Sequence, residues 1–133
     1  MTVETDEQGR IDVPHHDGEL IGVLCEGTSR VSLTFRCTRG VRRQIVLSGV
    51  HAMDISSFRN GNIILSMMVF PPDLAKRHVP EAMLRRLGHG RLASLAGKHV
   101  FVLDASYGAE VIADCDGVEV VELNRSREAL EDR

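Results

Sequence analysis

Aromatic side chains are scarce in this sequence: they make up 4% of its 133 residues, with one tyrosine and no tryptophan. Hydrophobic residues still account for 43% of the chain, so we expect a single domain with a mainly aliphatic core. Proteins that bind single-stranded nucleic acid usually stack its bases on several aromatic rings. The composition therefore argues against nucleic acid as a partner.

A long hydrophobic run is also missing. The longest apolar stretch is IILSMMVF at 63–70, whereas a membrane-spanning helix needs about 20 residues. The N-terminal segment MTVETDEQGRIDVPHHDGE is acidic and polar, which is unlike a secretory signal. We therefore expect a cytoplasmic protein without membrane association.

Cysteine is too rare and too irregularly spaced for a disulfide framework. The three cysteines, Cys25, Cys37 and Cys115, form no CxxC pair. Each lies in an apolar run, so we expect reduced thiols that pack as small hydrophobic side chains.

Charge is distributed unevenly, although the net charge is only −3. Residues 1–29 hold seven acids and one arginine, residues 30–98 hold twelve basic and three acidic residues, and residues 99–133 hold nine acids and three arginines. Either the acidic flanks pair with the basic middle inside the fold, or the basic middle forms a face for an acidic partner. We favour the first interpretation, because a nucleic-acid-binding domain is usually basic overall.

Alternation of apolar and polar residues dominates the chain, as in SRVSLTFRC at 29–37, and is typical of half-buried strands. Similar strand patterns occur at 19–27, 42–50, 51–58, 63–70, 98–105, 108–115 and 118–123. The run at 63–70 is apolar on both faces, so we expect it near the centre of a sheet. Hairpins are predicted at Gly27-Thr28 and at Asp116-Gly117. The first hairpin should pair Leu20 with Phe35, Gly22 with Leu33, and Leu24 with Val31.

A helical period replaces the alternation in PPDLAKRHVPEAMLRRLG at 71–88. Pro80 and Glu81 suit the N-terminal side of a helix, and Gly88 suits its end. We therefore expect one helix here, with a further turn before Gly97.

These elements predict a mainly β protein, namely an antiparallel β-sandwich or open barrel of about eight strands with one helical insert. The β domain should cover residues 15–123, with the insert at about 72–97. Residues 1–14 are expected to form a flexible arm, and residues 124–133 a polar tail.

Two neighbouring histidines and an aspartate precede the first strand, in VPHHDGELIG at 13–22. Adjacent strand residues point to opposite faces, so His15 and His16 do not readily share an ion. His16 and Asp17 could bind a metal together with a distant histidine. The simpler interpretation is a turn at Asp17-Gly18, and no cofactor is expected.

Four arginines surround one predicted turn: Arg36, Arg39, Arg42 and Arg43. Like charges in this arrangement repel unless an acid or anion neutralises them. They form either a solvated edge or a binding site for an acidic protein partner.

The segments HHDGEL, FRNGNIIL and SYGAEVIADCDGVEV resemble those of small uncharacterised bacterial β-rich proteins. Some of these are similar to the immunity proteins encoded beside polymorphic toxins. The resemblance covers residues 15–123 and implies a non-enzymatic protein that binds and blocks another protein. The helical segment at 71–97 and the many arginines depart from that group.

The sequence therefore favours a non-catalytic protein-binding module that uses a sheet face or the arginine turn. One alternative is a metal-binding protein or metal-dependent enzyme centred on His16 and Asp17. Another is a carrier of a small apolar ligand, with a cavity lined by Met53, Met67 and Met68. An exposed edge strand would also allow a homodimer by sheet extension.

Overall fold

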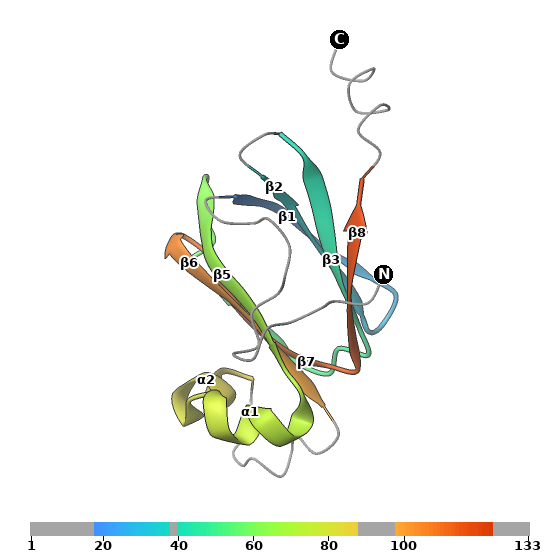
Figure 1. Ribbon diagram of the computed structural model, residues 1–133, viewed down its shortest axis with the longest axis vertical. Helices are drawn as coiled ribbons and strands as arrows, with labels where there is room; N and C mark the ends of the chain where they lie inside the picture. The colour runs from blue at the N-terminus through green and yellow to red at the C-terminus, as the bar shows by residue number, and fades with distance from the viewer. Residues whose placement is uncertain (1–17, 38–39, 88–97, 124–133) are drawn as a thin grey trace.

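The computed structural model describes residues 18–37, 40–87 and 98–123. In this part of the chain, eight antiparallel strands form one open sheet, accompanied by two short helices (Figure 1). The elements are β1 (Glu19–Glu26), β2 (Arg30–Arg36), β3 (Arg42–Ser48), β4 (Met53–Ser56), β5 (Asn62–Phe70), α1 (Pro72–His78), α2 (Glu81–Arg86), β6 (His99–Tyr107), β7 (Glu110–Cys115) and β8 (Gly117–Glu122). The predicted mainly β fold is confirmed. The predicted arm at 1–14, the tail at 124–133 and the insert residues 88–97 lie outside the described residues.

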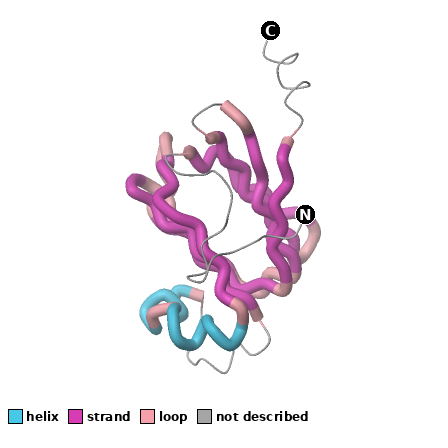
Figure 2. The backbone as a smooth tube through the Cα atoms, viewed as in Figure 1, coloured by secondary structure: helices cyan, strands magenta, loops and turns pink. Residues whose placement is uncertain are grey.

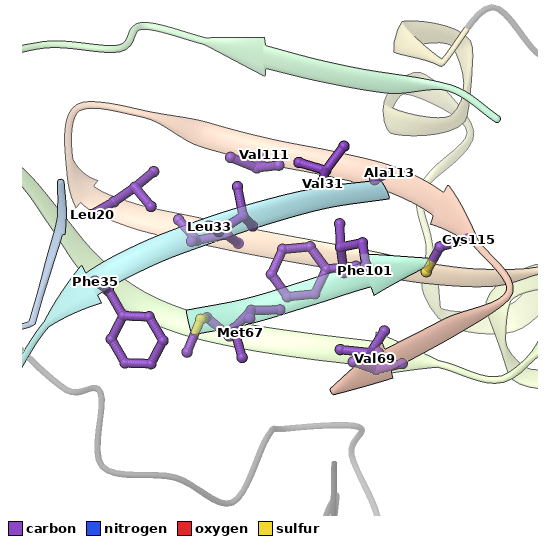
Figure 3. Packing of buried hydrophobic residues seen from close by; sticks show 14 of the residues in the cluster. Leu20, Val31, Leu33, Phe35, Met67, Val69, Phe101, Val111, Ala113 and Cys115 are labelled. Carbon is purple, nitrogen blue, oxygen red and sulfur yellow. The ribbon is translucent and has the colours of Figure 1, made fainter. Parts of the chain in front are cut away.

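The sheet bends into two facing layers. Its strand order is β4-β7-β6-β5-β1-β2-β3-β8, and β5 and β1 share only two residue pairs. Figure 1 shows β1, β2, β3 and β8 on one side and β5, β6 and β7 on the other. Side chains from both layers, among them Leu33, Met67 and Phe101, form the main core (Figure 3). The continuous apolar pattern of β5 thus correctly placed that strand centrally.

A β-bulge changes the register of the first hairpin. Leu20 lies opposite Phe35 as predicted, but from Gly22 onward each residue pairs one position later. Val23 therefore lies opposite Leu33. The predicted pairs of Gly22 with Leu33 and of Leu24 with Val31 are wrong, because the bulge inserts an extra residue into β1.

The predicted hairpin at Asp116-Gly117 is wrong. β7 pairs with β6 and β4, whereas β8 pairs with β3 at the other end of the strand order. At this point the chain turns a corner between the layers, beside the connection from β3 to β4. The backbone N–H of Asp116 donates to Ser48 O at 2.8 Å, and that of Asp114 donates to Ala52 O at 3.0 Å. Neither Asp116 nor Gly117 has the positive φ that a tight Asp-Gly hairpin turn requires.

Two helices replace the single predicted helix. Pro80 lacks an N–H and disfavours a helical conformation at Val79, which is extended at φ −92° and ψ 118°. α1 therefore ends at His78, and α2 begins at Glu81. Both helices lie at one end of the molecule (Figure 2). They contribute Ala75, Leu84 and nearby apolar residues to a second cluster against Val102 and Ile112 of β6 and β7.

Neither helix in the described part of the chain has the length and apolar character that a membrane span requires.

Candidate protein-binding surface

The structure separates the predicted arginine cluster onto two faces of the sheet. Arg36 and Arg42 pair across β2 and β3, so their side chains lie on the same face. Arg43 follows Arg42 in the strand and therefore points to the opposite face, in register with Phe35 and Glu122. Arg39 lies outside the described residues. The structure thus brings Arg36 and Arg42 together, but not Arg43.

The Arg43 side chain points into the fold, and its contacts suit a structural role. Its Nη1 donates to Cys37 Sγ at 3.2 Å, and its Nη2 lies 3.5 Å from a Glu122 carboxylate oxygen. Only 16% of its side chain is exposed. A guanidinium held in this way is largely removed from contact with a partner.

Ion pairs connect the acidic flanks of the sequence with its basic middle. Arg36 and Glu19 lie 2.8 Å apart, as do Lys98 and Asp116. The Arg43–Glu122 pair joins the middle to the C-terminal flank in the same way. These contacts support the interpretation that the uneven charge distribution serves internal complementarity.

Arg36 and Arg42 belong to a longer row of side chains that crosses five strands. Cross-strand pairs join Arg42 to Arg36, Arg36 to Glu19, Glu19 to Ile63, and Ile63 to Tyr107. Residues paired directly across neighbouring strands point to one side of the sheet. We call these five residues the transverse row. The row lies on the outer face, because the neighbouring Leu20 and Phe35 belong to the core.

The loop before β5 extends this surface with a second aromatic side chain. Phe58 and Tyr107 are 52% and 54% exposed. The Arg59 guanidinium lies 6.0 Å from the centre of the Tyr107 ring, within the range of a cation–π contact. A cavity of about 500 Å³ between β1 and the loop is lined by Glu19, Ile21, Phe58, Arg59 and other residues of these two segments.

Asn62 holds the loop backbone at Arg59, the residue after Phe58. The side chain of this buried residue accepts the Arg59 N–H at 2.8 Å and donates to Arg59 O at 2.6 Å. It also accepts the Ala109 N–H at 2.9 Å and donates to Leu20 O at 3.4 Å. All its hydrogen-bonding groups have partners, so the loop presents its side chains from a defined position. The Asn-Gly signal in RNGN predicted the turn, but nothing in the sequence singled out Phe58, Arg59 or Tyr107.

The predicted metal site at His16 and Asp17 lies outside the described residues. Within residues 18–37, 40–87 and 98–123, no group of three or more His, Cys, Asp or Glu side chains could hold a metal ion. Asp114 and His51 form a carboxylate–imidazole pair, in which Asp114 Oδ2 lies 3.7 Å from His51 Nδ1. Its Oδ1 accepts the backbone N–H groups of His51 and Ala52 at 3.0 and 2.7 Å, which indicates a structural role.

The three methionines predicted to line a ligand cavity lie on two faces of the sheet. Met67 is fully buried between the two layers, and Met53 packs against the same core. Met68 points to the opposite face, where it lines a different cavity beneath the helices. Alternation along β5 separates Met67 from Met68.

No family model matches the chain, and no curated protein or solved structure matches it either. The transverse row, the adjoining loop and the cavity between them form the candidate functional surface.

Proposed function

We propose that this protein is a non-catalytic protein-binding module, and that the transverse row forms its contact surface together with Phe58 and Arg59. The observation that carries the proposal is the alignment of arginine, apolar and tyrosine side chains on one face, from Arg42 to Tyr107. Tyrosine, phenylalanine and arginine are enriched at protein interfaces, and tyrosine and arginine are frequent among the residues that dominate binding energy.

The chemistry of the surface suggests what the partner presents. Arg36, Arg42 and Arg59 contribute three guanidinium groups, and Glu19 contributes one carboxylate. A partner with acidic side chains beside an apolar side chain would complement both the charge and the half-exposed rings. The resemblance to immunity proteins is consistent with this proposal, because such a protein acts by binding and blocking another protein.

The fixed loop backbone favours binding. Exposed side chains on a rigid backbone lose less conformational freedom in a complex than side chains on a disordered segment. Asn62 holds the backbone of Arg59, the residue after Phe58, through two of its four hydrogen bonds, and its other two join it to Leu20 and Ala109. The preorganised loop distinguishes this surface from a solvated strand edge.

The test is a binding measurement between this protein and the product of the neighbouring gene, by isothermal titration calorimetry. Tyr107→Ala and Arg59→Ala should each weaken the complex by about tenfold or more. Leu24→Ala is the matched control, because Leu24 is 58% exposed but lies outside the transverse row. It should change the affinity by less than about threefold.

Three results would count against the proposal. The neighbouring gene product could fail to bind, the control could weaken binding as much as Tyr107→Ala, or both row variants could bind like the wild type. Analytical ultracentrifugation of the free protein tests the competing use of an open sheet edge, β4 or β8, in a homodimer. A dimer unaffected by Tyr107→Ala would assign the association to a sheet edge.

A further inference from the structure

A second cavity lies between the helices and the outer face of β5 and β6. It has a volume of about 530 Å³, which is within the range of small-molecule sites. Its walls are formed by Met68, Phe70 and Val102 of the strands, by His78, Val79, Pro80 and Met83 of the helical segment, and by Asp104. The extended backbone at Val79 separates the two helices, so the Pro80 break shapes this cavity.

Asp104 is the single carboxylate among the described residues that line the cavity. It is half-buried on β6, opposite Ser66 of β5. No hydrogen bond or ion pair within the described part of the chain involves its carboxylate. Asp54, on the same outer face, differs in this respect, because the Arg86 guanidinium lies 2.7 Å from its Oδ2.

Asp104 places a half-buried carboxylate at a cavity wall that is otherwise lined mainly by apolar side chains. A ligand cation would complement this carboxylate, and an ammonium–carboxylate hydrogen bond is stronger than a neutral one. The thioethers of Met68 and Met83 and the ring of Phe70 suit an apolar or aromatic ligand body.

We infer that this cavity binds a small amphipathic ammonium compound. The ammonium group donates to the Asp104 carboxylate, and the apolar body lies against Met68, Phe70 and Met83. This site shares no residue with the transverse row, so it is independent of the protein-binding function proposed above.

The experiment uses three probes with similar apolar bodies and different charges: 2-phenylethylammonium, 2-phenylethanol and 3-phenylpropanoate. Each is titrated into the full-length protein and followed by two-dimensional amide NMR. The ammonium should bind about tenfold more tightly than the alcohol, and the carboxylate most weakly. The shifted amides should belong to β5, β6 and the two helices.

Asp104→Asn should lower the affinity for 2-phenylethylammonium about tenfold while leaving that for 2-phenylethanol within about twofold. Glu119→Gln is the matched control, because it also removes one carboxylate but lies on β8 in the other layer. It should leave both affinities unchanged. Met83→Trp, which fills the cavity from α2, should weaken binding of both probes.

Equal affinity for the ammonium and the alcohol would overturn the inference. So would an equal loss in Asp104→Asn and Glu119→Gln, or amide shifts centred outside β5, β6 and the helices. Because the probes are titrated into the wild type as well, the charge comparison stands even where a variant is less stable.

Discussion

Asn62 and Gly108 lie in direct contact where β5 begins and β6 ends. The backbone of Gly108 has a φ of +91°, and a Cβ atom placed on it would overlap the Asn62 amide and lie 3.1 Å from the Asn62 Cα. The same amide oxygen accepts the N–H groups of Arg59 and Ala109. One asparagine and one glycine therefore hold both the loop with Phe58 and the turn that follows Tyr107.

Gly108→Ala should destabilise the protein by about 2–4 kcal/mol, because it combines backbone strain with displacement of the buried Asn62 amide. Gly61→Ala is the matched control: φ at Gly61 is +87°, but nothing lies within 4 Å of an added Cβ. It should lower the free energy of unfolding by only about 1–2 kcal/mol, from the backbone alone. Urea denaturation measures both free energies of unfolding. Equal losses in the two variants would contradict a special role for the Asn62 contact.

Asp114→Ala should cost about 2–3 kcal/mol, because it leaves the backbone N–H groups of His51 and Ala52 without their acceptor. Asp114→Asn keeps an oxygen at this corner between the layers and should cost less. Asp116→Ala tests a neighbouring carboxylate that is 61% exposed and paired with Lys98, a solvent-screened contact that should contribute little to stability. Thermal unfolding measures the three melting temperatures. The melting temperature should be lowest for Asp114→Ala, higher for Asp114→Asn and highest for Asp116→Ala. A similar melting temperature for Asp114→Ala and Asp116→Ala would refute the structural role of Asp114.

The strands were predictable because their signal is local. The alternation of apolar and polar residues located the other strands, and the continuous apolar run at 63–70 located β5 and placed it centrally. The mainly aliphatic core followed from composition, and its aromatic members are Phe35 and Phe101 in the main cluster and Phe70 in the cluster against the helices. These features depend on side chains a few positions apart, so one sequence is enough to find them.

The incorrect predictions concern features that contacts between distant segments decide, and not the local sequence. Asp116-Gly117 has a hairpin composition, but β8 pairs with β3 and the dipeptide turns a corner between layers. The four arginines are neighbours in sequence, yet alternation along β3 places Arg42 and Arg43 on opposite faces. The transverse row joins five strands in register, so no short segment of the sequence contains it.

The cysteines show the same limit of prediction from local sequence patterns. All three cysteines lie in apolar runs and were predicted to be buried, but only Cys115 is, whereas Cys25 is exposed and Cys37 is intermediate. The prediction is wrong for Cys25, which lies towards the end of β1, where the strand becomes exposed. Sequence periodicity does not reveal how far a neighbouring layer extends over a strand.

Cys25 should react with iodoacetamide at least about tenfold faster than Cys115 in the folded protein, because alkylation requires an accessible thiolate. Peptide mass spectrometry after timed quenching measures the rate at each site. In urea above the unfolding transition the two rates should converge. Rapid modification of Cys115 without denaturant would show that the core around it opens readily.

The stability of the protein should fall in alkaline solution. Burial, and then the negative charges of Asp114 and Asp116, raise the pKa of the Cys115 thiol from its ordinary value of 9.0 to about 12. The hydrogen bond to Asp116 raises the pKa of Lys98 above 10.5. Both groups therefore hold their protons more tightly in the folded chain than in the unfolded chain. Their contribution is fully present below the unfolded pKa values and is lost as the pH rises through the folded ones.

For Cys115 this loss of stability occurs between pH 9 and about 12. The free energy of unfolding should fall over this pH range by up to about 1.4 kcal/mol per pH unit. Urea denaturation at pH 8, 9, 10 and 11 measures the slope. Cys115→Ala should flatten it, even though the smaller side chain lowers stability at every pH. Cys25→Ala, which alters an exposed thiol, should keep the wild-type slope. Parallel curves for the wild type and Cys115→Ala would mean that the buried thiol does not govern the alkaline loss of stability, and the decline would then belong to Lys98 or to other groups that titrate in this range.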